Sequence, residues 1–183
     1  MQNRLCGFRK IALRRVSAPR KSGLQEEETV SSCKECGAGR NACESLFHEL
    51  LVRDYSGRPP WAPLHAVSVA CYLFQHPTRT DTETTAFYWA LLHAYLQQGI
   101  DALTFMTQRA RQRNSHRFGG RAPTADDFPG APPFPPVSST PTTYAVTIQD
   151  VAADGSFPAE GYEDRVRRWA DATISAWKQA SAH

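Results

Sequence analysis

Three cysteines in the first quarter of the chain constrain its fold more than any other feature. Cys33 and Cys36 are separated by two residues and followed by Gly37, and Cys43 comes seven residues after Cys36. A Cys-x-x-Cys turn places both sulfurs on one side, which suits a tetrahedral Zn²⁺ ion with Zn–S distances of about 2.3 Å. Cys43 opens a segment with helical apolar periodicity. We therefore expect a zinc knuckle, with the third cysteine on the first turn of the helix that follows.

The charge is distributed unevenly along the 183 residues. The formal net charge is +3, but residues 1–22 hold seven basic side chains and no acidic one. The other 161 residues therefore carry 14 basic and 18 acidic side chains, a net charge of −4. A mildly acidic body argues against general nucleic-acid binding. The basic head is expected to be a disordered extension, with a basic amphipathic targeting helix as the alternative.

The cysteine count and the length of the apolar segments indicate the cellular location to expect. An odd cysteine count with uneven spacing is not typical of a secreted disulfide scaffold, so we expect reduced thiols and a cytoplasmic location. The longest apolar stretch, residues 86–96, is about half of the ~20 residues that span a bilayer. We therefore expect no transmembrane segment.

Periodicity and chain breakers predict a mainly α-helical fold, a four- to five-helix bundle with an N-terminal zinc-knuckle-like cap and a long proline-rich loop. Helices are expected at about 41–55, 62–76, 82–98, 101–113 and 159–180. The third, apolar nearly all round, belongs at the centre of the bundle. Residues 144–148 alternate in polarity and are expected to form a short strand or an extended arm.

These elements divide the chain into four parts. The expected parts are a basic head and linker (1–32), the knuckle with the helical core (33–113), the proline-rich loop (114–143), and a short extended segment with the last helix (144–183). The loop holds seven of the 13 prolines and no sustained period, so we expect it to cover the bundle without a fold of its own. The last part completes the same domain as the core.

Two histidines on the second helix are candidates for a fourth metal ligand. His65 and His76 fall on one helix face, but eleven residues place them about 16 Å apart along the axis. Both cannot bind one ion while the helix is intact. His76 is the stronger candidate because Pro77 frees its backbone from the helix, and His65 is the alternative. Each could instead be an ordinary surface or capping residue.

The chain resembles a bacterial family known only as a domain of unknown function. The resemblance rests on the Cys-x-x-Cys-Gly-Ala knuckle, the later cysteine and a His-x6-Tyr-x2-Gln-His-Pro helix, and it covers about residues 33–180. The matching residues are Cys33, Cys36, Gly37, Ala38, Cys43, His65, Tyr72, Gln75, His76 and Pro77. The resemblance implies a second site lined by a carboxylate and a histidine, where this chain has Ala70 and Tyr88. It implies no particular reaction.

The favoured hypothesis is a small zinc-binding helical protein that acts as an accessory or regulatory module, with a protein or small-molecule partner. Its zinc is mainly structural and is bound by Cys33, Cys36, Cys43 and His76 (or His65). The alternative is a metal-dependent enzyme whose open site uses the same cysteines and a histidine, with His65, His76, Asp54 or Glu44 as base.

Two further hypotheses are weaker. The Cys33–Cys36 pair could perform thiol redox chemistry, but such pairs normally sit at a helix N-terminus in a βαβ unit, which is not evident here. A basic run of Arg109, Arg111, Arg113 and Arg117 is interpreted as a solvated loop, with a phosphate- or RNA-contacting patch as the alternative.

Overall fold

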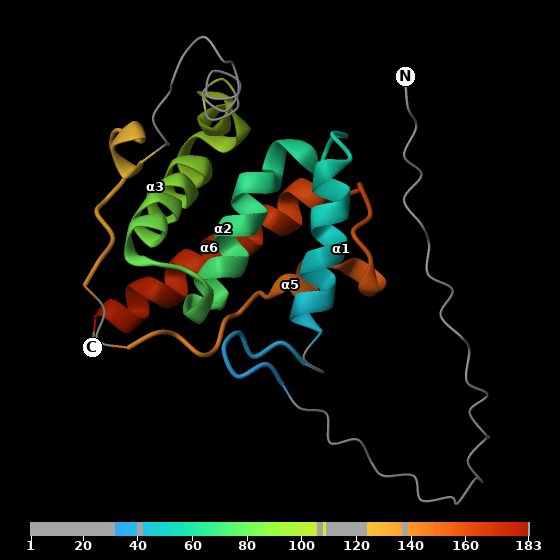
Figure 1. Ribbon diagram of the computed structural model, residues 1–183, viewed down its shortest axis with the longest axis horizontal. Helices are drawn as coiled ribbons and strands as arrows, with labels where there is room; N and C mark the ends of the chain where they lie inside the picture. Colours follow the sequence, from blue (N-terminus) through green and yellow to red (C-terminus); the bar gives the residue numbers. More distant parts are fainter. Residues whose placement is uncertain (1–31, 40–41, 106–107, 109–123, 137–138, 183) are drawn as a thin grey trace, which may run out of the picture.

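The computed structural model describes residues 32–39, 42–105, 108, 124–136 and 139–182, and its regular elements in this part are helices (Figure 1). The main helices are α1 (Cys43–Tyr55), α2 (His65–Gln75), α3 (Thr82–Gln98), α5 (Ile148–Val151) and α6 (Tyr162–Ser181). The prediction of a mainly α-helical bundle is confirmed. No helix among the described residues is long and apolar enough to cross a membrane.

The core lies where α2, α3 and α6 pack on one another. Seven consecutive residues of α3, Trp89–Tyr95, are buried, as expected for a helix that is apolar all round. Helix α6 instead buries one face, whose members are Tyr162, Val166, Trp169, Ala170, Thr173, Ile174 and Trp177. Helix α1 packs beside α2 and against α5. The predicted central position of the third helix is therefore confirmed.

The ends of α3 follow from local chemistry. The carboxylate of Asp81 accepts a hydrogen bond from the Thr84 amide at 2.7 Å and caps the first turn. Gly99, with φ of 69°, stops the helix because other residues rarely adopt that conformation. A 3₁₀ turn, η4 (Gly99–Leu103), follows. Most of the helix predicted at 101–113 lies outside the described residues.

The second predicted helix consists of two pieces. A 3₁₀ turn, η2 (Ala62–Leu64), leads into α2, and the helix ends at Gln75. His76 no longer has helical backbone geometry: its φ is −134° and its ψ is 66°. The cause is Pro77, because the α region is disfavoured for a residue that precedes proline. A second 3₁₀ turn, η3 (Pro77–Arg79), follows directly. The chain direction therefore changes at His76.

The described part of the proline-rich loop lies against the bundle. Its only regular element there is a three-residue 3₁₀ turn, η5 (Ala125–Asp127). Phe134 packs among Phe74, Trp89 and Trp177, with ring centroids 6.1, 5.5 and 5.5 Å away. Phe128, 5% exposed, is a second anchor and packs against Phe87 and Phe105, with ring centroids 5.8 and 5.0 Å away. Residues 109–123 and 137–138 of this region lie outside the described residues.

The segment before α5 is an irregular arm and not a strand, with bends at residues 145 and 146. Thr147 caps α5, since its backbone N–H donates to the Asp150 carboxylate at 2.7 Å and its hydroxyl accepts from the Gln149 amide. The buried side chain of Gln75 donates to the Val146 carbonyl at 2.8 Å. The arm is therefore fastened to α2 by a side chain and not by a β-ladder.

Candidate metal centre

Four side chains from three chain segments converge at the N-terminal end of the described chain. One ligand atom from each of Cys33, Cys36, Cys43 and His76 lies within 4.8 Å of the others. Cys36 and His76 are 1% exposed and Cys43 is 5% exposed. The four cysteines of the described chain are free thiols. The knuckle, the first turn of α1 and the end of α2 therefore meet in a closed group.

The knuckle is shaped by its own backbone. The Cys33 amide donates to the Ala38 carbonyl at 2.7 Å, and the Gly37 amide donates to the Cys33 carbonyl at 2.9 Å. Gly37 has φ of 76°, which a residue with a side chain adopts only with strain. The Cys33–Cys36 pair lies in this turn and not at a helix N-terminus, the setting that a redox-active pair normally requires.

His76 presents one ring nitrogen to the cysteines. Its Nδ1 lies 2.8 Å from the Tyr72 carbonyl oxygen. Because a carbonyl oxygen can only accept, Nδ1 carries the ring proton and donates this hydrogen bond. Its Nε2 is then unprotonated and lies 3.7 Å from Cys33 Sγ. The Tyr72 ring stacks on the imidazole with centroids 4.1 Å apart and fixes its plane. A backbone acceptor that selects the tautomer is typical of histidines that bind metal ions.

Two surface contacts hold the three segments around this group. The Glu35 carboxylate accepts from the hydroxyl and amide of Thr78, at 2.8 and 3.2 Å, and links the knuckle to η3. Arg79 forms an ion pair with Glu44 at 3.2 Å and links η3 to α1. Glu44, a predicted base of the enzyme hypothesis, therefore has a cationic partner. No local sequence pattern indicated Thr78 or Arg79, because their partners lie 43 and 35 residues away.

The protonation states follow from burial. Burial raises the pKa of Cys36 to about 12 and also raises that of Cys43. Burial acts in the same sense on Cys33, but hydrogen bonds from the backbone of Cys36 and Glu35 outweigh it and lower the pKa of that thiol. Burial lowers the pKa of His76, which keeps its imidazole neutral. The group can therefore offer neutral nitrogen and, once protons leave, thiolates.

His65 lies elsewhere, in a pair with Asp54. Its Nδ1 is 3.1 Å from Asp54 Oδ2, and the Asp54 side chain is fully buried while that of His65 is 36% exposed. Burial raises the pKa of Asp54, and the hydrogen bond to His65 opposes this shift. The pair connects α1 to α2. His65 is not among the residues that converge on the cysteines.

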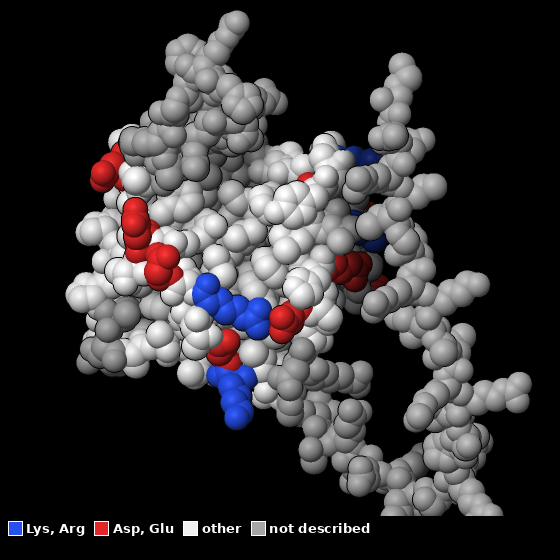
Figure 2. Space-filling model, viewed as in Figure 1, with Lys and Arg blue, Asp and Glu red and all other residues white. Residues whose placement is uncertain are grey.

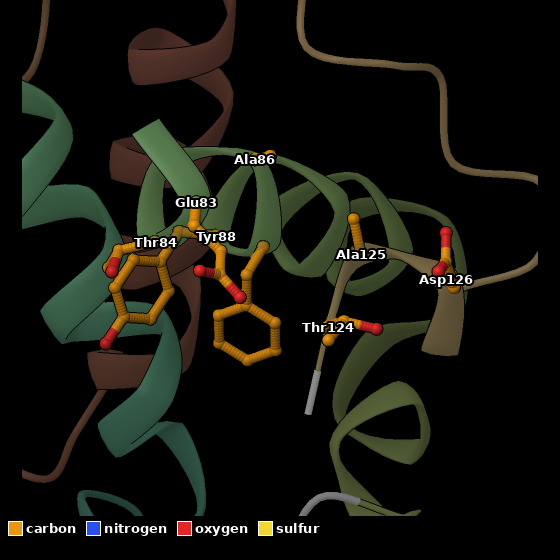
Figure 3. A pocket seen from close by; sticks show the side chains of 8 residues that line it. Glu83, Thr84, Ala86, Tyr88, Thr124, Ala125 and Asp126 are labelled. Atoms are coloured by element: carbon orange, nitrogen blue, oxygen red, sulfur yellow. The ribbon is translucent and has the colours of Figure 1, made fainter. Parts of the chain in front are cut away.

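A cavity is lined by Tyr88, at one position of the second site implied by the resemblance, but not by Ala70, the other position. It has a volume of about 430 Å³ between α3 and the turn η5. Figure 3 shows Glu83, Tyr88 and Asp126 around it. Its described lining contains no histidine, and the Cys–His group is the only potential metal cluster in the described chain. Among the described residues, the lining of this cavity therefore contains no potential metal cluster.

The charged side chains on one face of the described chain are of mixed sign (Figure 2). On the face in Figure 2 the described basic side chains lie beside acidic ones and do not form a continuous basic surface. Arg79 likewise lies beside an acidic side chain, that of Glu44. The predicted basic run of Arg109, Arg111, Arg113 and Arg117 lies outside the described residues.

Comparison with known proteins gives a family and no function. The chain matches no curated protein and no solved structure. Residues 31–178, which include the cysteine knuckle and α6, match a family of unknown function (DUF5946). The match spans most of the chain, so this protein is a member of that family.

Proposed function

We propose that this protein is a zinc-binding helical module in which Cys33, Cys36, Cys43 and His76 hold one Zn²⁺ ion. The convergence of these four ligand atoms within 4.8 Å is the observation that carries the proposal. Three thiols and an imidazole form a donor set that suits Zn²⁺, which is commonly bound by three cysteines and one histidine in structural sites.

The distance between Cys33 and His76 fits a tetrahedral ion. With Zn–S near 2.3 Å and Zn–N near 2.05 Å, a tetrahedral angle separates sulfur from nitrogen by about 3.6 Å. The separation of Cys33 Sγ and His76 Nε2 is 3.7 Å. The tautomer of His76, fixed by the Tyr72 carbonyl, leaves Nε2 as the donor atom. No large rearrangement of these two side chains is needed for binding.

A structural role of the metal is favoured over a catalytic one. A catalytic zinc keeps a position for water, whereas structural zinc has four protein ligands. Four ligands are present here, and Cys36, Cys43 and His76 are almost fully buried. The Asp54–His65 pair is a candidate for base chemistry. Its His65 is the first residue of α2 and therefore lies about 16 Å from His76 along the helix, at ~1.5 Å per residue. We infer that the ion fastens the knuckle to the bundle, and that the protein acts by binding a partner, as an accessory or regulatory module.

Metal analysis of the purified protein tests the ion. Mass spectrometry is expected to find one zinc per chain, and a chelator is expected to lower the unfolding temperature, because metal affinity contributes to folding stability. Less than about one metal in ten chains after reconstitution with Zn²⁺ would contradict the proposal.

Cobalt substitution separates the structural role from the catalytic alternative. Co²⁺ in the site should give the intense visible absorption of tetrahedral coordination, and added imidazole or azide should leave it unchanged, because a four-ligand site has no free position. A spectrum that shifts in saturable fashion with either ligand would show an open position. That outcome would favour a metal-dependent enzyme.

A further inference from the structure

The side chain of Gln149, on α5, pairs with the backbone of Gly39, just after the knuckle. The Gly39 amide donates to Gln149 Oε1 at 2.8 Å, and Gln149 Nε2 donates to the Gly39 carbonyl at 2.8 Å. The two residues are 110 positions apart in the chain. Because one planar amide both accepts and donates, the pairing fixes the orientation of the two segments as well as the distance between them.

Gly39 lies between ligands of the metal centre in the chain. Cys36 precedes it, and Cys43 follows it as the first residue of α1. The residue before Gly39 closes the knuckle, because the Ala38 carbonyl accepts from the Cys33 amide at 2.7 Å. A shift of Gly39 would therefore move the two knuckle sulfurs relative to that of Cys43.

The same part of the chain also holds the end of α2, beside the histidine ligand. Gln75, the residue before His76, is 1% exposed and donates through Nε2 to the Val146 carbonyl at 2.8 Å. Shortly after Val146, Gln149 meets Gly39. This short stretch therefore bridges the knuckle and the end of α2 by hydrogen bonds that use no metal-ligand atom.

Ligands that are already in place bind an ion more tightly than ligands that must first be brought together. If only a fraction of the metal-free chains has the knuckle in place, the apparent dissociation constant rises in inverse proportion to that fraction. The hydrogen bonds of Gln149 can form before an ion arrives, because they do not involve the sulfurs. Loss of a residue that supports the ligands of a metal site typically weakens metal binding roughly 10–100-fold.

We propose that Gln149 is a positioning residue of the metal centre, which docks the knuckle on the bundle before Zn²⁺ binds. It supplies no ligand and acts through the backbone of Gly39. This role rests on the metal site proposed above. Loss of the Gln149 amide therefore weakens zinc binding but leaves the identity of the four ligands unchanged.

A substitution of similar length in the full chain tests this role. Gln149→Met keeps the length of the side chain and loses both hydrogen bonds to Gly39. Competition with a chromophoric chelator is expected to show at least about tenfold weaker Zn²⁺ binding. The same substitution at Gln179, an exposed residue of α6, is the control and should leave the affinity unchanged. A dissociation constant for Gln149→Met equal to that of the parent would overturn the proposal.

The visible spectrum of bound Co²⁺ checks that the ligands stay the same. At saturating Co²⁺, Gln149→Met and the parent should show the same intense tetrahedral absorption, because neither lacks a ligand. A changed spectrum at saturation would show that Gln149 alters the coordination itself, which contradicts a role in docking alone.

Alkylation of the metal-free chain separates positioning from general support of the fold. With the knuckle docked, Cys36 and Cys43 are almost fully buried, as is Cys71 on α2. Iodoacetamide with detection by mass spectrometry is expected to label Cys36 and Cys43 faster in metal-free Gln149→Met than in the metal-free parent. Cys71 should stay protected in both proteins, because the bundle remains folded.

Two results of this labelling would overturn the positioning role. One is equal labelling of Cys36 and Cys43 in the variant and the parent, and the other is faster labelling of Cys71 as well. A parent chain that binds no zinc would contradict the metal site itself. Either labelling result with a zinc-binding parent would contradict only the role of Gln149.

Discussion

Cys33 Sγ and His76 Nε2 lie 3.7 Å apart although 43 residues separate them in the chain. Cys33 belongs to a turn that its own backbone shapes, and His76 is the first residue beyond α2. The contact therefore joins a local motif to the helical core. We therefore expect the stability of the bundle and metal binding by this group to depend on one another.

Replacing each of the two candidate histidines by alanine is expected to have different effects on zinc content and on stability. His76→Ala should lose most of the bound zinc, because it removes the only nitrogen among the four converging ligand atoms. His65→Ala should keep one zinc per chain but destabilise the fold by about 1–3 kcal/mol, since the buried Asp54 loses its partner. Metal analysis and urea unfolding of both variants check this pattern. Zinc loss in His65→Ala with retention in His76→Ala would reverse the assignment.

Buried cysteines inside and outside the group provide a matched comparison. Cys36→Ser should lose zinc and lower the unfolding temperature, because a hydroxyl is a poor replacement for a thiolate ligand. Cys71→Ser changes an equally buried residue of α2 that is not part of the group, and it should keep its zinc. The two variants are compared by mass spectrometry and thermal unfolding. Equal zinc content would show that Cys36 is not a ligand.

Zinc binding is expected to release protons. The raised pKa of Cys36, about 12, and that of Cys43 keep both thiols protonated near pH 7, so thiolate coordination must displace about two protons. Zinc affinity should therefore rise with pH and fall on acidification. Calorimetric titration of the metal-free protein in two buffers of different ionisation enthalpy measures the number released. Release of no protons would contradict thiolate coordination.

The turn at Gly37 should be sensitive to any side chain. Gly37→Ala forces an L-residue into φ of 76° at a cost of about 1–2 kcal/mol, and zinc affinity should fall about tenfold because the knuckle is distorted. Gly57, with φ of 71°, is the control, since Gly57→Ala carries similar strain outside the group. Competition with a chromophoric chelator measures both affinities. An equal loss in the two variants would show that the knuckle geometry is not specifically required.

The central position of α3 predicts a large effect of truncating its core. Leu91 is fully buried, so Leu91→Ala should cost about 2–5 kcal/mol through lost contacts and a cavity. Val52 on α1 is 71% exposed, and Val52→Ala should change stability by at most about 0.5 kcal/mol. Urea denaturation of the two variants gives both values. If both variants lost at most about 0.5 kcal/mol, α3 would not be part of the core.

Helix limits and the knuckle could be predicted from the sequence because they depend on neighbouring residues. Asp81 caps α3 and Gly99 ends it, both within one turn of the residues that they affect. The turn that joins Cys33 to Cys36 is equally local. The capping box of Thr147 and Asp150 has a recognisable pattern as well, but the alternation of residues 144–148 predicted a short strand or an extended arm and not the helix that begins at Ile148.

Pro77 already favoured His76 in the sequence, but only the tertiary structure decided that this histidine meets the cysteines and which surfaces border the loop. His65 and His76 share one helix face, so periodicity cannot distinguish them. The packing of α1 on α2 places Asp54 beside His65, whereas the break at Pro77 turns His76 to Cys33. The prolines likewise predicted a loop but not its place, which Phe134 sets by packing against the aromatic core. These contacts join residues far apart in the chain, and no local pattern records such distances.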